Sequence, residues 1–437
     1  MGGSLLGTFG LGMLSRVPIG FALAAASLVT LYFLTTDNLA IGAQRIVAGV
    51  TPYPLLAVPL FILAGGLMNA GGISRRLLDL ADAIVGRMTG GLAHTNILAS
   101  LFFGGLSGSS VADVSSLGRI LIPAMRERKY TAAYAAAVTA SSAIIAPILP
   151  PSITLILFGV VTGTSIGQLF FAGVIPAMLY MAVLMVTVLV TVKRSGFEPE
   201  AVKTMDEKDI GRTPRDQIAP FWPALAKAIP ALLLPVLILV GIRGGIFTPT
   251  EAAGMAVAYA VLVGAFVYRE LTLPKIFTAM KDSVALIGLI LLVMAAAQLY
   301  SWVLTSGGVP QSVAAALLAV SASPIVILLL INVLLLVVGM FIEANAAIII
   351  LVPIIFPVAV ELGIDPLHLG VVIVVNMGLG LVTPPVGLNL MLASEIAEID
   401  LLAGARAMLP FLAGGLAFLL LLTFVPALTT WLPGVLY

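Results

Sequence analysis

Cysteine, histidine and charged residues are scarce in this sequence, and each scarcity excludes a class of chemistry. The 437 residues include no cysteine, two histidines and only 9% Asp, Glu, Lys and Arg. Without cysteine there is no disulfide, no thiol nucleophile and no thiolate metal site, and two histidines are too few for a histidine-rich metal centre. A formal net charge of +1 lacks the basic footprint of a nucleic-acid-binding protein. We therefore expect no nucleic-acid partner and no cofactor.

Apolar residues, in contrast, are abundant. They make up 61% of the chain. Charged residues make up 9%, whereas a soluble domain carries about 25%. A chain of this length with so few charges cannot cover its own surface in water, so it needs membrane lipid as its solvent. The N-terminal stretch MGGSLLGTFGLGML has no basic leader, and we do not expect a signal peptide there. The composition predicts an all-α polytopic membrane protein.

Apolar stretches long enough for spans, or for shorter re-entrant legs, recur along the chain. They lie at 4–15, 17–34, 54–69, 92–106, 114–125, 131–158, 168–192, 223–243, 250–268, 283–305, 323–341, 345–360, 367–392 and 408–432. Residues 70–91 are expected to form a loop. The polar segment 193–222 holds six Lys or Arg and six Asp or Glu, and we interpret it as a linker between two halves.

The two halves share a pattern. FFGGLSGSSVADVSSLGRILIPAM precedes ASSAIIAPILPPSITLILFG in the first, and VVGMFIEANAAIIILVPIIFPVAV precedes NMGLGLVTPPVGLNLMLAS in the second. Short segments interrupted by Gly and Pro at matching places indicate inverted repeats with a transporter's binding site between them. The predicted units are a first repeat at 1–192 with a re-entrant hairpin at 92–125 and a broken helix at 131–158, the cytoplasmic linker at 193–222, and a second repeat at 223–437 with a hairpin at 323–360 and a broken helix at 367–392.

The placement of Lys and Arg predicts the orientation in the membrane. If hairpin 92–125 enters and leaves on one side, the basic segments that flank it share that side with the linker. Of the 21 Lys and Arg residues, only Arg45 and Arg243 then fall clearly on the far side. The basic side is the cytoplasm, so the second hairpin opens outward and the halves are inverted.

The segment Gly104-Gly105-Leu106-Ser107-Gly108-Ser109-Ser110 is a poor helix interior, because each glycine costs about 1 kcal/mol relative to alanine. It predicts the tip of the first hairpin, where hydroxyls and carbonyls suit a hard cation. The alternative is a crossing of helices through small residues. Three prolines in Ala146–Ser152 remove amide donors in mid-span, and two prolines in Val382–Asn389 do the same in the other half. The alternative for either break is a structural kink.

Three ionisable side chains are predicted inside the membrane, namely Asp113, Arg119 and Glu343. Such groups usually face a cavity or pair with each other. Asp113 and Glu343 are interpreted as occupying equivalent places in the two hairpins, where they could bind a cation, cap a helix or be protonated. Asn345 and Asn389, beside the breaks, are as suited to fixing the backbone as to contacting a substrate.

The segments GGLAHTNILASLFFGGLSGSSVADVSSLGRILIPAM, AAAVTASSAIIAPILPPSI and GLGLVTPPVGLNL resemble the large membrane (permease) subunit of tripartite ATP-independent periplasmic (TRAP) transporters, the DctM type, within the wider ion-transporter superfamily. The resemblance covers nearly the whole chain. It implies an elevator-type subunit that imports organic acids such as a C4-dicarboxylate or sialic acid, with Na⁺ as the coupling ion. It also implies two partners, a small four-helix membrane subunit and a periplasmic substrate-binding protein, and a bacterial or archaeal cytoplasmic (inner) membrane.

The resemblance also implies where the ligands bind. Sodium would be held by residues at the two tips and breaks, which are Ser107, Gly108, Ser109, Ser110, Pro150, Gly339, Glu343, Thr383 and Gly387. The substrate would lie between the two tips, near Ser110, Asp113, Pro151, Ser152, Asn345, Pro384 and Asn389. Three alternatives remain: a stand-alone sodium- or proton-coupled anion transporter, an ion channel, and a membrane enzyme. The last is disfavoured because the chain lacks a plausible catalytic constellation.

Overall fold

The computed structural model describes residues 2–15, 17–34, 39–192, 220–321 and 323–437, and within them it contains helices and no strands. The first half comprises α1 (Gly2–Leu14), α2 (Ile19–Leu34), α3 (Leu39–Ala48), α4 (Ala57–Ala70), α5 (Ile73–Val85), α6 (Gly91–Ser107), α7 (Ser110–Glu127), α8 (Ala132–Ser142), α9 (Ile153–Thr162) and α10 (Ile166–Thr191). Short 3₁₀ turns precede α4 and follow α8, at Tyr53–Leu56 and Ala143–Ile145.

The second half comprises α11 (Phe221–Arg243), α12 (Pro249–Leu262), α13 (Leu273–Ser306), α14 (Val309–Val320), α15 (Pro324–Gly339), α16 (Ala344–Glu361), α17 (Pro366–Gly380), α18 (Leu388–Ile396), α19 (Leu401–Phe424) and α20 (Ala427–Leu436). A π-helical turn, Val263–Val267, extends α12. Seven helical segments in the described residues are long and apolar enough to cross a membrane, and the shorter apolar helices belong mainly to the hairpins and broken helices.

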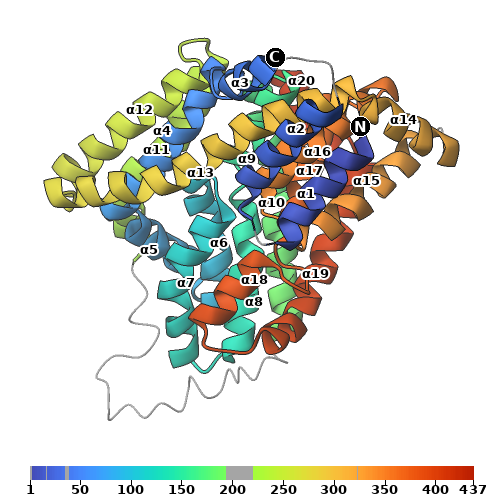
Figure 1. The fold of residues 1–437 in the computed structure, drawn as a ribbon. Helices are drawn as coiled ribbons and strands as arrows, with labels where there is room; N and C mark the ends of the chain where they lie inside the picture. Colours follow the sequence, from blue (N-terminus) through green and yellow to red (C-terminus); the bar gives the residue numbers. More distant parts are fainter. Residues whose placement is uncertain (1, 16, 35–38, 193–219, 322) are drawn as a thin grey trace.

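Each half contains a helical hairpin followed by a broken helix. In the first half α6 and α7 pack as the hairpin and α8 and α9 form the broken helix; in the second half α15 and α16 correspond to the hairpin and α17 and α18 to the broken helix. We call these eight helices the core. In Figure 1 the helices α7, α8 and α18 of the core occupy the lower part of the view, while α4, α12 and α13 lie along its upper left.

Contacts in one half have counterparts in the other. The hairpin leg α7 packs on α18 of the opposite half, and α16 likewise packs on α9. Helix α8 contacts α19 as α17 contacts α10, and α4 contacts α12 as α13 contacts α2. The two halves therefore interlock through their hairpins, which agrees with the predicted fold of two inverted repeats. The exact boundaries of the repeats stay predictions, and most of the predicted linker, 193–219, lies outside the described residues.

Some expectations about loops and span ends were wrong. Residues 70–91, expected as a loop, contain the helix α5, which buries Ile73, Leu77 and Leu80 along one face. That face is apolar at helical spacing, whereas its opposite side is too polar for a span. Helix α13 begins ten residues before the predicted span at 283–305.

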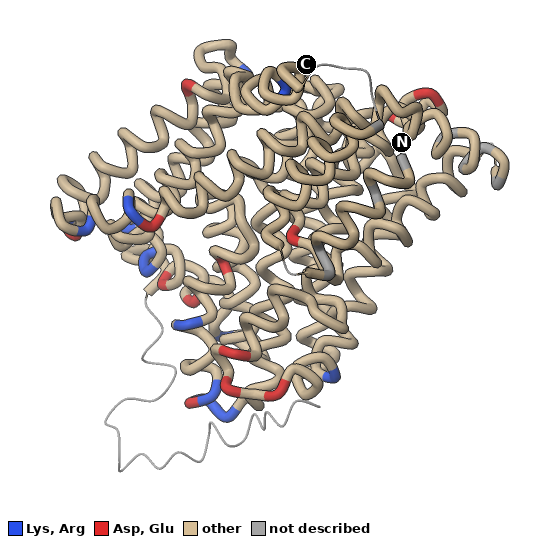
Figure 2. The backbone as a smooth tube through the Cα atoms, in the orientation of Figure 1, with Lys and Arg blue, Asp and Glu red and all other residues tan. Residues whose placement is uncertain are grey.

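Charged positions are concentrated away from the middle of the molecule. In Figure 2 they cluster at the lower end and along the left edge, and few interrupt the long apolar tube between them. Ionised side chains are costly inside a bilayer, so they collect where helices end in water. Asp113 on α7 and Glu343 at the start of α16 are exceptions within the core, and both belong to the predicted site.

Candidate functional site

The first hairpin tip packs against the first helix break. Helix α6 ends at Ser107, and Gly108 adopts a left-handed conformation with φ of 59°. A Cβ at Gly108 would lie 2.5 Å from the carbonyl oxygen of Pro151, and one at Gly104 would lie 2.7 Å from the Cα of Ala146. Glycine is required because the tip backbone touches the break backbone, which leaves no room for a side chain. Tip and break are both buried.

The second tip and break meet in the same way. A Cβ at Gly339, the last residue of α15, would lie 3.0 Å from the Cα of Gly380, the last residue of α17. Across this junction the Gly387 amide donates to the Met340 carbonyl, at 3.2 Å. Phe341 at this tip is 57% exposed. The second tip is therefore open to its surroundings where the first is closed in.

Helix ends of like polarity gather around these junctions. The C-terminal ends of α6 and α15 lie against the C-terminal ends of the first segment of each broken helix. The N-terminal ends of α9 and α16 adjoin, because the Thr154 hydroxyl donates to the Asn345 side-chain oxygen, at 3.0 Å. Each C-terminal end carries a partial charge of about −0.5 and each N-terminal end about +0.5. The C-terminal ends at the junctions thus suit cations, and the N-terminal end of α9, which a neutral serine caps, suits an anion.

Buried oxygen atoms without hydrogen-bond partners lie at three of the predicted positions. In the described residues these include the Ser107 hydroxyl, both carboxylate oxygens of Asp113 and the side-chain oxygen of Asn389. Unpartnered buried polar atoms are costly and are uncommon in folded proteins. Hard oxygen donors of this kind are suited to a cation such as sodium, because carboxylate and hydroxyl groups replace part of its water shell.

Asp113 borders a buried polar network between the first hairpin and the first broken helix. The Ser100 hydroxyl near it donates to Ser142, at 2.9 Å, and Asn96 donates to Thr139, at 2.7 Å. The ion pairs of the described residues, Arg76–Glu270 and Arg126–Glu398, do not involve Asp113, and Arg119 is exposed. Asp113 therefore has neither a basic partner nor a capping role among the described residues.

Glu343 has a different role from Asp113, which corrects the expectation that they are equivalent. Its carboxylate accepts from the amides of Asn345 and Ala346, at 3.0 and 3.2 Å, and so caps α16. In the first hairpin the corresponding cap is Ser109, whose hydroxyl accepts from the Ala112 amide. Ser109 and Glu343 are 234 positions apart, the same spacing that separates the two Pro-Pro pairs.

The other predicted residues lie at the junctions in varied surroundings. Ser152 caps α9 and also bonds the carbonyl of Pro147. The Thr383 hydroxyl donates to the Leu379 carbonyl, at 2.7 Å. Ser110 is buried in the first turn of α7, and Pro384 is half-buried. The Pro150–Pro151 and Pro384–Pro385 bonds are both cis.

Sequence reasoning missed Thr154 and Ser100. Thr154 joins the first break to the second hairpin, and Ser100 lies beside Asp113. A lone hydroxyl in an apolar run gives little signal, because Ser and Thr often bond the preceding turn of their own helix. The two histidines lie away from the predicted site residues in the sequence. Both are buried, and His368 forms a hydrogen bond with the Thr429 hydroxyl.

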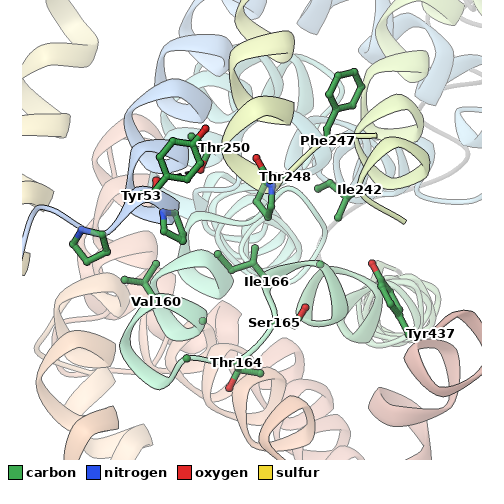
Figure 3. Close-up of a pocket in the computed structure, with 16 residues that line it drawn as sticks. Tyr53, Val160, Thr164, Ser165, Ile166, Ile242, Phe247, Thr248, Thr250 and Tyr437 are labelled. Atoms are coloured by element: carbon green, nitrogen blue, oxygen red, sulfur yellow. Dashed lines mark hydrogen bonds between the residues drawn. The ribbon is translucent and has the colours of Figure 1, made fainter. Parts of the chain in front are cut away.

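A pocket of about 500 Å³ lies apart from these junctions (Figure 3). It is lined by the loop between α9 and α10, the turn between α11 and α12, and the residues before α4. Tyr53, Ser165 and Thr248 are among the side chains drawn around it in Figure 3. None of the predicted sodium or substrate residues lines this pocket.

Together, the interlocked hairpins, the paired breaks and the spans define an integral membrane transport protein. A profile of the tripartite ATP-independent periplasmic transporter family, DctM component, matches residues 6–428. The chain belongs to this family, and it is a multi-pass protein of the cytoplasmic membrane.

Similar proteins are transport permeases from several bacteria. The chain is 39% identical to the sialic acid TRAP transporter large permease protein SiaM of Vibrio cholerae, over 99% of this chain and 98% of that protein. It is 39% identical to the C4-dicarboxylate TRAP transporter large permease protein DctM of Pseudomonas aeruginosa, over 94% of each. Among solved structures, the YdaH transporter of Alcanivorax borkumensis shares the fold, with a TM-score of 0.63 and 20% identity over 90% of each chain.

Proposed function

We propose that this chain is the translocating subunit of a sodium-coupled, ATP-independent importer of organic anions. The observation that carries the proposal is the pairing of helix ends at the two tip–break junctions. Carbonyl-bearing C-terminal ends meet at each junction, and N-terminal ends of α9 and α16 adjoin beside it. Broken helices of this kind hold coupling ions and anionic substrates in secondary transporters.

Sodium is the coupling ion that these junctions support. The unpartnered Ser107 hydroxyl ends α6 at the first tip, and the Asp113 carboxylate lies one turn into the next helix leg. The second junction offers Gly339 and the turn before Gly387, where backbone carbonyls replace side-chain ligands. We propose that backbone carbonyls of the tip and the break, which these glycine contacts bring together, bind the ion.

The substrate is proposed to be an organic acid. The relatives are named for sialic acid, isethionate, C4-dicarboxylates and 2,3-diketo-L-gulonate, all of which are anions at neutral pH. The N-terminal end of α18, beside Asn389, has no side-chain cap and supplies a positive site for such a negative charge without a basic side chain. Asn389 is fully buried with its amide unpartnered, so it is available to bind a substrate oxygen.

Two further subunits are proposed as partners, a small four-helix membrane subunit and a periplasmic substrate-binding protein. The family is described as tripartite. The isethionate relative, named DctMQ, is matched over 98% of this chain but only 66% of that protein, so it has additional sequence. We further propose that the core moves as an elevator against the flanking helices, because its hairpins and broken helices interlock with one another across the two halves.

Reconstitution tests the proposed division of labour. Liposomes that contain this chain, its small membrane subunit, the periplasmic binding protein and a sodium gradient should take up the binding protein's ligand. Liposomes with this chain alone should not. Sodium-driven uptake by the chain alone would contradict the tripartite proposal and would favour a stand-alone anion transporter.

The variant Asp113→Asn tests the sodium assignment. The substitution keeps the size of the side chain but removes its charge, so the apparent sodium affinity of uptake should fall if Asp113 holds the ion. The sodium concentration for half-maximal uptake is the measurement, at matched expression and thermal stability. An unchanged sodium response would show that Asp113 does not bind the coupling ion.

A further inference from the structure

A second pocket, of about 410 Å³, lies where α5, α11 and the segment between α12 and α13 meet. It is unlike the core because its walls are charged. Three cationic side chains, Arg75, Arg76 and Lys227, line it together with two carboxylates, Asp79 and Glu270. The net formal charge of these five side chains is +1. The pocket lies at the start of α11 and beyond the end of α12, on the side of the protein predicted to be cytoplasmic.

One of the three cations holds the wall of the pocket together. Arg76 forms an ion pair with Glu270, at 2.9 Å, and donates to the Gly72 carbonyl, at 2.8 Å. Its guanidinium also stacks on the Tyr268 ring, at 3.8 Å from the ring centroid. The Tyr268 hydroxyl in turn donates to the Lys227 carbonyl, at 2.8 Å. These bonds fix α5 and α11 around the pocket and use the charge of Arg76.

The other two cations remain available. Arg75 from α5 and Lys227 from α11 are exposed, and both lie within electrostatic reach of Asp79. Over the described ranges, neither side chain makes an ion pair or a side-chain hydrogen bond. Arg75, Lys227 and the neighbouring Asp79 together leave one positive charge at the rim of the pocket, which suits an anionic group.

An apolar track leads from this pocket along α11. Ala226 and Pro230 line the pocket, and Leu233 and Leu237 continue the same helix face at spacings of three and four residues. Leu233 and Leu237 are 45% and 41% exposed, so this face is open to lipid. Trp222, at the start of α11, is 75% exposed, as expected of an aromatic side chain at a membrane interface.

We propose that this pocket binds the headgroup phosphate of a membrane phospholipid, with Arg75 and Lys227 as its ligands and the acyl chains along Leu233 and Leu237. Basic pockets between helices on the cytoplasmic side are suited to phospholipid headgroups. A free phosphate would use the same two cations but would gain nothing from the apolar track. The bound lipid would sit where α5, the connection between α4 and the first hairpin, meets α11.

Binding to the delipidated full-length chain in detergent, followed by native mass spectrometry, tests this site. The probes are dioleoylphosphatidylglycerol, dioleoylglycerol, which lacks the phosphate, and inorganic phosphate. We expect phosphatidylglycerol to bind about tenfold or more tightly than dioleoylglycerol, because only phosphatidylglycerol carries the phosphate that the two cations would bind. Inorganic phosphate should not displace the lipid at equal concentration.

The double variant Arg75→Gln/Lys227→Gln should lose about tenfold or more of its phosphatidylglycerol affinity. The matched control, Lys281→Gln/Arg406→Gln, removes two exposed cations outside the pocket on the same predicted side and should retain the affinity. Equal losses in both double variants would overturn the site, because they would show only a general charge effect. Displacement of the lipid by inorganic phosphate would overturn the lipid assignment in favour of a free-anion site. If dioleoylglycerol bound as tightly as phosphatidylglycerol, the proposal that the pocket binds the headgroup phosphate would be overturned.

Discussion

The hydrogen bond between Thr154 and Asn345 should contribute measurably to the stability of the core. It joins residues 191 positions apart in the chain, at 3.0 Å, and ties the first break to the second hairpin. Asn345 also donates to the Glu343 carboxylate, at 2.8 Å, so its orientation is fixed from both sides. Thr154 is 3% exposed, and water cannot easily replace its hydroxyl.

The variant Thr154→Val keeps the shape of the side chain and removes the donor. The half-buried Asn345 oxygen then loses its partner, which should reduce the free energy of unfolding by about 0.5–1.5 kcal/mol. The variant Asn345→Ala removes the acceptor and should destabilise the protein by a similar amount. Because both changes break the same bond, the double variant should be less destabilised than the sum by about 0.6–1.5 kcal/mol.

A double-mutant cycle of reversible unfolding in mixed micelles measures this coupling energy. Thr305→Val is the matched control, because the hydroxyl of Thr305 is exposed and bonds only the Ser301 carbonyl of its own helix. The control should change the free energy of unfolding by less than about 0.5 kcal/mol. Additive effects of the two core variants, within about 0.3 kcal/mol, would refute the reasoning.

Two further predictions concern packing and polar contacts in the core. Gly339→Ala should lower the free energy of unfolding by about 1–3 kcal/mol and reduce sodium-driven uptake, because the new Cβ would lie 3.0 Å from the Cα of Gly380. The control Gly254→Ala places a Cβ where no atom lies within 4 Å, so it should be neutral or stabilising. Thermal unfolding measures both variants. Asn376→Ala should cost about 1–3 kcal/mol by the same measure, because the Asn376 amide donates to both the backbone and the side-chain oxygen of Asn332, each at 2.9 Å. A Gly254→Ala loss as large as that of Gly339→Ala, or a stable Asn376→Ala protein, would contradict these expectations.

The hairpins and breaks could be predicted from sequence because glycine and proline act locally. Gly108 ends α6, and the paired prolines at 150–151 and 384–385 lie between helices. Gly104 and Gly105 lie inside α6, and single prolines such as Pro176 lie inside a helix, so one such residue alone does not locate a break. Helix α5 could not be located by a search for apolar runs, because only one of its faces is apolar.

The pairing of Asp113 with Glu343 shows where sequence reasoning failed. The sequence places one acidic residue near each hairpin tip, and this favours the interpretation that the two are equivalent. The structure aligns Ser109 with Glu343 as helix caps, at the spacing of 234 that the Pro-Pro pairs already displayed. Capping depends on which residue immediately precedes the first turn of a helix. Two residues of like charge need not occupy that position in both hairpins.

The sequence by itself determined that this protein lies in a lipid membrane, that its architecture is repeated, and where its helices break. These follow from composition and from local backbone chemistry, which act over a few residues. Only the tertiary structure decided that Glu343 caps a helix, that Asp113 lacks a partner among the described residues, and that Thr154 reaches Asn345. Each of those depends on which groups the fold brings together from distant parts of the chain, and polar atoms are satisfied or left unpaired only once those neighbours are set.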